Sequence, residues 1–590
     1  MTVKQKDSII SATNLIVDYQ VNDTVRAIDG INISIEQGEL IAIIGRNGSG
    51  KSTLAKCFNA LVIPTEGTVK VKDMDTCVTE YVPQIRQTVG MLFQNPDNQI
   101  VAAIVEDDIA FGPENLSVSP ENIEKCVIQS AQAVNMKQYL KHPVHNLSGG
   151  QKQKAAIAGI IAMNPECIIF DEATSMLDAK GRKAILDIAL KLNRENNITV
   201  IYITHNMEEA AYAKRVLVMN DGKIVMDSSP QQVFSDEKHL RDMGLAVPSI
   251  MQLSYALNKK GMPVPTGIFE PDELSQYICN SILHAPSKKD TNACRLNEMS
   301  CDYSQNEPVI KFENVNHVYM KGTPFEKKAI YDINLTIYEG EYVAIVGNTG
   351  SGKSTLIQHI NGMLLPTSGN VYVNGIQIRK DSKLKNIRKK VGVVFQFPEH
   401  QLFEETVYKD IAFGPKQMGL TPSEIHERVL EAINLVGLEN TILERSPFQL
   451  SGGEKRRVAI AGVVALNTEI LVFDEPTVGI DPEGREQILK MIYDLKRKKD
   501  LTIILVTHNI EDAAKYINRI VVLRDGRIHR IGTPYDIYKI AYTDDIDLTI
   551  PPIHKVMMNL HNFHPAVNDD IYTVSEAADE ILKHTDKVLL

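Results

Sequence analysis

Short, unbroken runs of apolar residues recur along the chain between polar and glycine-rich segments. Leu40–Ile44, Ile168–Phe170 and Leu471–Phe473 are three of them. Continuous apolar runs of this length are typical of strands buried on both faces of a parallel sheet. Ala155–Met163 and Val458–Leu466 predict buried helices, because each has about half of the roughly 18 apolar residues that a membrane span needs. The pattern predicts α/β domains without a transmembrane segment.

The pattern occurs twice. The sequence GRNGSGKST begins at Gly45, and GNTGSGKST begins at Gly347. Gln94 follows the first of these glycines by 49 residues, and Gln396 follows the second by the same 49. A spacing repeated over this distance indicates two copies of one fold. Similar text after the last motifs predicts a small helical appendage behind each copy, and a polar, aperiodic stretch predicts a flexible linker. The predicted divisions are domain 1 (1–245), appendage 1 (246–283), linker (284–307), domain 2 (308–545) and appendage 2 (546–590).

The amino-acid composition limits the classes of partner that the chain is expected to bind. The chain has 63 Lys and Arg against 74 Asp and Glu, a formal net charge of −11, so no general electrostatic attraction to nucleic acid or anionic lipid is expected. Its seven cysteines form no CxxC pair, which argues against a zinc site and a disulfide framework. The N-terminal segment has no apolar stretch of the signal-peptide kind. A cytosolic protein that reaches a membrane through a partner is the expectation.

The glycine-rich loops predict phosphate binding. Leu40–Ile44 reads as a strand and the segment from Ser52 as a helix, which is the strand–GxxxxGK[ST]–helix arrangement of the P-loop. Glycines let backbone N–H groups face phosphate oxygens, Lys51 neutralises the β and γ oxygens, and the Ser52 hydroxyl ligates Mg²⁺. The two sets are Gly45, Gly48, Gly50, Lys51 and Ser52, and Gly347, Gly350, Gly352, Lys353 and Ser354.

Two apolar strands end in paired acids, Asp171–Glu172 and Asp474–Glu475. An aspartate at this edge can hold Mg²⁺ through water, and the adjacent glutamate can polarise the attacking water. A solvated strand edge is the alternative, which the P-loops disfavour.

The segments LSGGQ, at Leu147–Gln151, and LSGGE, at Leu450–Glu454, resemble the signature motif of ABC ATPases. The resemblance implies two tandem P-loop ABC-type nucleotide-binding domains of α/β fold, each with a small helical subdomain. It implies adenine-stacking tyrosines, Q-loop glutamines, D-loop aspartates (Asp178 and Asp481) and switch histidines. The implied catalytic residues are Glu172, His205, Gln94, Glu475, His508 and Gln396. The implied nucleotide-binding residues add Tyr19, Asn47, Thr53, Ser148, Gly149, Gly150, Tyr319, Thr355, Ser451, Gly452 and Gly453 to the loop residues above. The implied Mg²⁺ ligands are Ser52, Gln94, Asp171, Ser354, Gln396 and Asp474.

The resemblance also implies head-to-tail pairing, with one ATP between the Lys51 loop and Ser451–Gly453 and another between the Lys353 loop and Ser148–Gly150. Glu454 stands where the family usually has glutamine, and Ala173 where it usually has proline. Neither change removes a group that the chemistry needs, so both sites are expected to hydrolyse ATP.

The segments after the Q-loop glutamines, Asn95–Val101 and Phe397–Thr406, narrow the resemblance further. Both lead to an Asp-Ile-Ala-Phe-Gly-Pro box that ends at Pro113 or Pro415. This text resembles the two ATPase subunits of energy-coupling-factor (ECF) importers of vitamins and transition-metal ions, here fused in one chain. The resemblance implies a membrane T component that docks through coupling helices, an S component for the substrate, and a peripheral place on the cytoplasmic face of the cell membrane.

Each of these segments carries one acid, Asp97 or Glu399, beside apolar residues. An apolar groove with an acid at its rim suits a short amphipathic helix that bears an arginine. Solvated loop charges are the alternative reading of these acids.

Two other functions stay open from the sequence. A tandem ABC ATPase of a sugar importer is one, although such proteins typically have one damaged site. A cytosolic ABC translation factor is the other, although those proteins usually carry a long, charged, helical linker.

Overall fold

The computed structural model describes residues 8–21, 23–282, 306–323, 326–380, 384–508, 514, 516–543, 548 and 550–585. Residues 284–305 of the predicted linker lie outside this part. The chain forms two compact units. The first unit contains Met1–Ala285, Asp481–Glu483 and Val574–Leu590, and the second contains Pro286–Ile480 and Gly484–Thr573. The predicted fold class, two tandem α/β nucleotide-binding domains, is confirmed by two copies of the same pair of sheets.

The central sheet of the first unit has six strands in the order β10-β9-β3-β8-β7-β6. Five of them are parallel, and β10 pairs antiparallel with β9. The apolar runs form the middle strands because both faces of the sheet are covered, one by α1 and the antiparallel sheet and the other by helices, and every residue of β3, β7 and β8 is buried. The strands are β3 (Leu40–Gly45), β6 (Val89–Leu92), β7 (Cys167–Asp171), β8 (Thr199–Ile203), β9 (Arg215–Asn220) and β10 (Lys223–Ser228).

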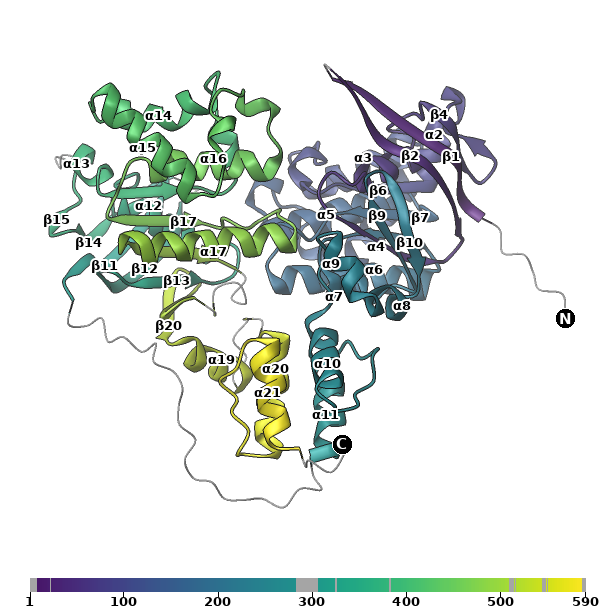
Figure 1. Cartoon of the computed structure of the whole chain (residues 1–590). Helices are drawn as coiled ribbons and strands as arrows, with labels where there is room; N and C mark the ends of the chain where they lie inside the picture. The colour runs from purple at the N-terminus through teal and green to yellow at the C-terminus, as the bar shows by residue number, and fades with distance from the viewer. Residues whose placement is uncertain are drawn as a thin grey trace. The chain divides into compact units, whose positions relative to one another are not determined.

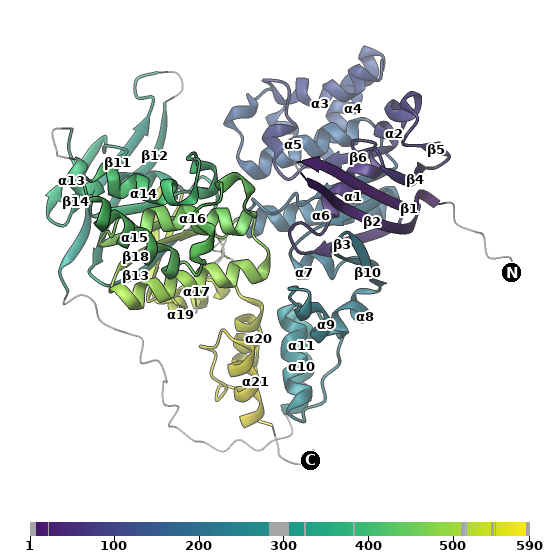
Figure 2. The same cartoon turned by 45° about the horizontal axis from the view of Figure 1, so that its top comes forward.

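A second, antiparallel sheet of the first unit has the order β2-β1-β4-β5. Figure 2 shows α3, α4 and α5 gathered together above the central sheet. The strands of this antiparallel sheet are β1 (Ser8–Val21), β2 (Asp23–Glu36), β4 (Glu66–Val71) and β5 (Met74–Asp75). The helices are α1 (Lys51–Phe58), α2 (Val82–Thr88), α3 (Val105–Asn115), α4 (Pro120–Ala133), α5 (Gly149–Ala162), α6 (Ala179–Asn196), α7 (Met207–Ala210), α8 (Pro230–Ser235), α9 (Glu237–Asp242), α10 (Ser249–Lys259) and α11 (Pro271–Ile282).

The second unit repeats both sheets, in the orders β16-β17-β18-β13-β19-β20 and β12-β11-β14-β15. Figure 1 shows α14, α15 and α16 gathered as α3–α5 are in the first unit. The strands are β11 (Pro308–Tyr319), β12 (Lys327–Tyr338), β13 (Tyr342–Val346), β14 (Ser368–Val373), β15 (Ile376–Gln377), β16 (Val391–Val394), β17 (Ile470–Asp474), β18 (Thr502–Thr507), β19 (Arg519–Arg524) and β20 (Arg527–Gly532). The helices are α12 (Lys353–Ile360), α13 (Leu384–Arg388), α14 (Val407–Gln417), α15 (Pro422–Leu435), α16 (Gly452–Val464), α17 (Pro482–Lys499), α19 (Pro534–Thr543) and α20 (Pro552–Phe563).

The last helix among the described residues, α21 (Val574–Lys583), belongs to the first unit. It contacts α10 there, and Lys260 at the end of α10 forms an ion pair with Asp579. Ala577, Ala578 and Ile581 of α21 are fully buried. The segments predicted as appendages are therefore helical, while the predicted domain boundaries stay a prediction. Among the described residues, no helix combines the length and the apolar character needed to cross a bilayer.

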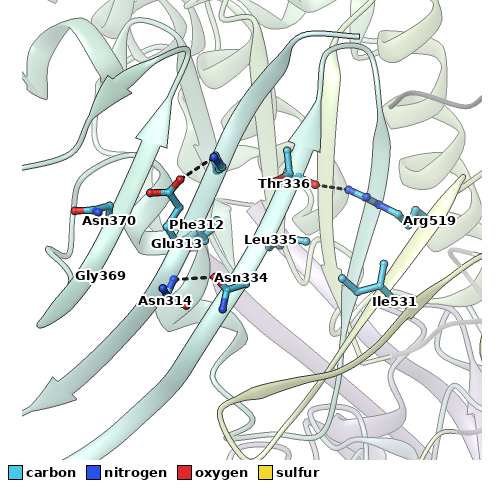
Figure 3. A pocket seen from close by; sticks show the side chains of 11 residues that line it. Phe312, Glu313, Asn314, Asn334, Leu335, Thr336, Gly369, Asn370, Arg519 and Ile531 are labelled. Atoms are coloured by element: carbon cyan, nitrogen blue, oxygen red, sulfur yellow. Dashed lines mark hydrogen bonds and ion pairs between the residues drawn. The ribbon is translucent and has the colours of Figure 1, made fainter. Parts of the chain in front are cut away.

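A hollow over the antiparallel sheet of the second unit is shown in Figure 3. Its charged side chains already have partners. Lys311 lies 2.7 Å from Glu313, and Arg519 donates a hydrogen bond of 2.6 Å to the Thr336 carbonyl oxygen. None of the residues predicted to bind nucleotide lines this hollow. The candidate sites lie at the ends of the central strands instead.

Candidate active sites

The loop after β3 curls around the lysine that begins α1. Gly50 has a φ of 99°, and a Cβ there would lie 2.5 Å from the Ala27 carbonyl oxygen, so only glycine fits. Lys51 is buried, and its Nζ donates to the carbonyl oxygens of Gly45 and Arg46 at 2.9 Å each. Burial lowers the pKa of Lys51, and nearby Glu172 raises it. The ammonium group is thus held inside the loop by weak carbonyl partners that phosphate oxygens can replace.

The loop after β13 in the second unit has the same construction. Gly352 also has a φ of 99°, and Lys353 is buried. Lys353 Nζ donates to the carbonyl oxygens of Gly347, at 2.7 Å, and Asn348, at 3.0 Å. Both predicted P-loops therefore have a buried lysine at a helix start, within a glycine-rich loop, which is the geometry that binds phosphate.

The aspartates that end β7 and β17 lie beside the P-loop serines. The Ser52 hydroxyl donates to Asp171 Oδ1 at 2.8 Å. Burial raises the pKa of Asp171, and the Ser52 hydrogen bond acts against it. Burial and the charge of Glu475 raise the pKa of Asp474 to about 6 despite a hydrogen bond from Ser354. A hydroxyl and a carboxylate side by side fit Mg²⁺, which takes oxygen ligands and favours the ionised acid.

The glutamates that follow these aspartates are held from two sides. Glu172 has a φ of 50° and Glu475 a φ of 49°, a left-handed backbone that turns each side chain away from its strand. Gln94 Nε2 donates to Glu172 Oε2 at 3.0 Å, and His205 Nε2 lies 2.5 Å from Oε1. In the second unit, Gln396 Nε2 donates to Glu475 at 3.1 Å, and His508 Nδ1 lies 3.4 Å from it.

Burial by itself would raise the pKa of Glu172 and of Glu475. The hydrogen bond and the charge of the neighbouring histidine, together with the P-loop lysine, outweigh it, so both pKa values lie below the ordinary value of 4.5. Each glutamate is therefore ionised at neutral pH and oriented by two partners. A fixed carboxylate of this kind can polarise a water molecule. The two glutamines bind the glutamates in this structure, and their predicted role as Mg²⁺ ligands stays a prediction.

The signature serines begin α5 and α16. In both helices the serine closes a capping box with the residue three positions later. Gln151 Oε1 accepts the Ser148 backbone N–H at 2.8 Å, whereas Glu454 also accepts the Ser451 hydroxyl, at 2.7 Å. Glu454 thus preserves the helix cap, but the Ser451 hydroxyl already donates its hydrogen bond to the Glu454 carboxylate. The predicted pairing of each signature with the opposite P-loop stays a prediction.

The two tyrosines predicted to stack on adenine end or nearly end their strands. Tyr19 and Tyr319 are both half exposed, as a stacking surface requires. The Tyr319 hydroxyl also lies 3.1 Å from the Thr355 hydroxyl at the start of α12, so this ring is tied to its P-loop helix. Asp178 caps α6 by accepting the Gly181 N–H at 2.8 Å. The roles of these residues toward nucleotide stay predictions.

The aspartate of each Asp-Ile-Ala-Phe-Gly-Pro box fixes the segment after the Q-loop glutamine. Asp108 Oδ1 accepts the backbone N–H groups of Val101, at 2.8 Å, and Ala102, at 3.0 Å. Asp410 does the same for Phe403 and Glu404. This leaves Val101 65% exposed and Phe403 59% exposed. The sequence offered the box as a family resemblance and gave no indication of this structural role.

The acids predicted at the groove rims already have basic partners in their own unit. Asp97 lies 2.6 Å from Lys152 on α5. Glu399, in the 3₁₀ helix η6 (Pro398–Gln401), is bound by Arg456 through both carboxylate oxygens, at 2.8 and 2.9 Å. Glu399 is therefore not a solvated loop charge, because its carboxylate is paired with a buried arginine of its own unit, while contact with a partner's arginine stays a prediction. Arg456 could not be recognised from the sequence, because a basic residue within a helix does not reveal which way its side chain points.

Comparison with known proteins agrees with this geometry. The family described as "ABC transporter" matches residues 28–175 and 330–478. A protein of Caldanaerobacter subterraneus, provisionally named as an ABC transporter ATP-binding protein, is 35% identical over 91% of this chain and 93% of its own length. Energy-coupling factor transporter ATP-binding protein EcfA2 of Acetivibrio thermocellus is 51% identical over 47% of this chain. EcfA1 of C. subterraneus is 52% identical over 46% of it, and the match covers 99% of each of these two shorter proteins.

The raised pKa of Asp474 predicts a pH dependence of stability in the absence of metal and nucleotide. The folded chain binds this proton more tightly (pKa about 6) than an unfolded chain does, at 3.8, so the stabilisation is complete below 3.8 and is lost as the pH rises through 6. Relative to Asp474→Asn, the wild-type chain should lose roughly 2 kcal/mol of unfolding free energy between about pH 4 and pH 7. Urea unfolding of both proteins at several pH values measures this. A constant difference between them contradicts the prediction.

Proposed function

The chain belongs to the ABC transporter family and is an ATPase, and from this premise we propose that it energises an ECF-type importer of a vitamin or a transition-metal ion. The observation that carries the proposal is the paired construction of the sites. Each unit holds an ionised glutamate between a glutamine and a histidine, beside a buried P-loop lysine. The names of the two half-length relatives support the ECF assignment.

We propose that two ATP molecules bind head to tail, each between the P-loop of one domain and the signature of the other. Ser148–Gly150 and Ser451–Gly453 stand at helix starts, where serine hydroxyls and glycine N–H groups suit a γ-phosphate. Mg²⁺ would be held by Ser52 with Asp171 and by Ser354 with Asp474, and would neutralise phosphate charge as the bond to the γ-phosphate breaks. Glu172 and Glu475 would orient and polarise the attacking water.

We further propose that a membrane T component docks on the segments after Gln94 and Gln396 and carries an S component that binds the substrate. Support comes from the large apolar side chains exposed there: Val101 and Phe403, with Phe111 and Phe413 on the following helices. The Phe403 and Phe413 rings contact each other edge to face, with centroids 5.0 Å apart. Exposed apolar clusters of this kind suit an amphipathic helix. The protein would then work on the cytoplasmic face of the cell membrane, without a nucleic-acid partner.

Removing either catalytic carboxylate should lower ATP turnover and leave ATP binding intact. Glu172→Gln and Glu475→Gln keep the side-chain volume but remove the charge that polarises water, which costs on the order of 10²–10⁴-fold in the affected site. Steady-state phosphate release and nucleotide binding measure the two effects, with the exposed surface residue Glu195→Gln as the control. If one variant abolished turnover while the other left it unchanged, the proposal of two catalytic sites would be wrong.

The head-to-tail arrangement predicts which signature serves which P-loop. In a Glu475→Gln background, which leaves mainly the site built on Lys51 active, Ser451→Arg should abolish the residual turnover because the large cation displaces the γ-phosphate contact. Ser148→Arg in the same background is the matched control and should leave that turnover in place. Light scattering at the assay concentration must find single chains. Equal effects of the two arginine variants would contradict this pairing.

The docking segments predict the loss of a membrane complex. Val101→Ser with Phe403→Ser removes two side chains whose burial contributes roughly 1.5–3 kcal/mol each. The double variant should therefore no longer co-purify with an integral membrane protein, while its ATP binding stays normal. Phe563→Ser, which changes an equally exposed phenylalanine at the end of α20, is the control. Normal membrane co-purification of the double variant would refute docking at these segments, and co-sedimentation of the wild-type chain with ribosomes instead would refute the importer function.

A further inference from the structure

Arg456 is a buried arginine that the chemistry proposed above does not use. It lies on α16 and is 4% exposed. Its Nε and Nη2 donate to the two carboxylate oxygens of Glu399. Its Nη1 donates to the carbonyl oxygens of Pro476, at 3.1 Å, and Val478, at 2.8 Å. All three nitrogens of the guanidinium group are therefore bound to fixed acceptors.

These contacts join three segments of the second unit that the nucleotide site also uses. Glu399 belongs to η6, which begins two residues after Gln396. Pro476 and Val478 follow Glu475, and α16 begins at the signature. Phe397, between Gln396 and η6, has a φ of 54°, and its ring lies 6.0 Å from the guanidinium carbon of Arg456. The residue after the Q-loop glutamine is thus held in a left-handed backbone that phenylalanine rarely adopts, against the face of this arginine.

In the first unit, the ion pair between Asp97 and Lys152 lies at the surface, with 62% of the Asp97 side chain exposed, and the buried connections between the corresponding segments are made by neutral groups. Gln153 occupies the position of Arg456, and its Nε2 donates to the Gln94 carbonyl oxygen at 3.2 Å. Ser175 occupies the position of Val478, and its hydroxyl accepts from Gln94 Nε2 at 3.3 Å and donates to the Glu172 carbonyl oxygen at 2.9 Å. Asn95, the counterpart of Phe397, has a φ of −102°. The same three segments are therefore connected in both units, but only the second unit has a buried guanidinium at the junction.

We propose that Arg456 is a positioning residue that transmits the nucleotide state of the site built on Lys353 and Glu475 to residues 397–403, and that this half is the more rigidly coupled of the two. The proposal rests on the proposed function only for what residues 397–403 contact. A buried guanidinium cannot leave Glu399 without leaving a charge uncompensated at low dielectric. When the 476–478 loop moves, Arg456 therefore moves η6 with it. In the first unit, the neutral links of Gln153 and Ser175 can exchange partners at smaller cost.

Hydrogen exchange on the full chain tests this coupling. Glu172→Gln with Glu475→Gln provides a parent chain that retains bound ATP, and exchange is followed in residues 95–101 and 397–403 with ADP and with ATP. Both segments of the parent are expected to change their exchange rates between the two nucleotides. Adding Arg456→Gln introduces the residue type that the first unit has at this position. It should abolish the nucleotide-dependent change in 397–403 and preserve it in 95–101. Arg457→Gln, on the neighbouring position of α16, is the matched control and should preserve both changes.

A purely structural role of Arg456 gives a different result. It would raise the exchange rate of 397–403 by the same factor with ADP and with ATP and leave the nucleotide-dependent difference in place, which overturns the proposal. If Arg456→Gln unfolds the second unit, the Glu399→Gln variant tests the proposal instead. It keeps the contacts of Arg456 to Pro476 and Val478 and should likewise abolish the nucleotide-dependent change in 397–403 alone. A full nucleotide-dependent change in 397–403 in Glu399→Gln, or none in the parent, also overturns the proposal. Membrane partners take no part in the measurement, so its outcome is independent of the importer function.

Discussion

Two carboxylates on consecutive residues, at the end of a buried strand and beside one buried lysine, impose the main constraint on each half of this protein. The two acids need different surroundings, because burial makes it costly for two adjacent carboxylates to be charged at the same time. The structure separates them: burial and the neighbouring glutamate raise the pKa values of Asp171 and Asp474 against the hydrogen bonds from their serines, while histidine and lysine lower those of Glu172 and Glu475. The left-handed turn at each glutamate makes the separation possible, since it sends the second side chain toward a different set of partners.

Much of this arrangement follows from the sequence, because it depends on local pattern. A continuous apolar run that ends in acids predicts a buried strand with polar groups at its edge, and a GxxxxGK[ST] loop predicts a lysine at a helix start. Contacts that depend on side-chain direction over long separations are not visible in this way. Arg456 and Glu399 are 57 residues apart, and nothing in their spacing distinguishes them from two solvated charges. The hydrogen bonds of Asp108 to the segment before α3 likewise became clear only from the folded backbone.

The two halves share one fold, yet they differ at the junction where the Q-loop, the signature helix and the loop after the strand-end acids meet. The junction between the Q-loop, the signature helix and the loop after Glu172 or Glu475 contains Gln153 and Ser175 in one half and Arg456 in the other. The signature cap contains Gln151 in one half and Glu454 in the other. The lysine, aspartate, glutamate, glutamine and histidine of the proposed chemistry are the same in both halves. The two halves therefore differ in the connections around the proposed sites and agree in the groups that form them.

The position of α21 has a consequence for the biosynthesis of the chain. This helix follows the second unit in the sequence, but it packs with α10 in the first unit. The apolar face of α10 that α21 covers must therefore stay open while the whole second unit is translated, until α21 leaves the ribosome. A nascent chain that stalls in the second unit exposes this face, and a truncation that removes α21 damages the unit that was made first. The first unit is thus synthesised first, but its fold is completed only after the second unit has been synthesised.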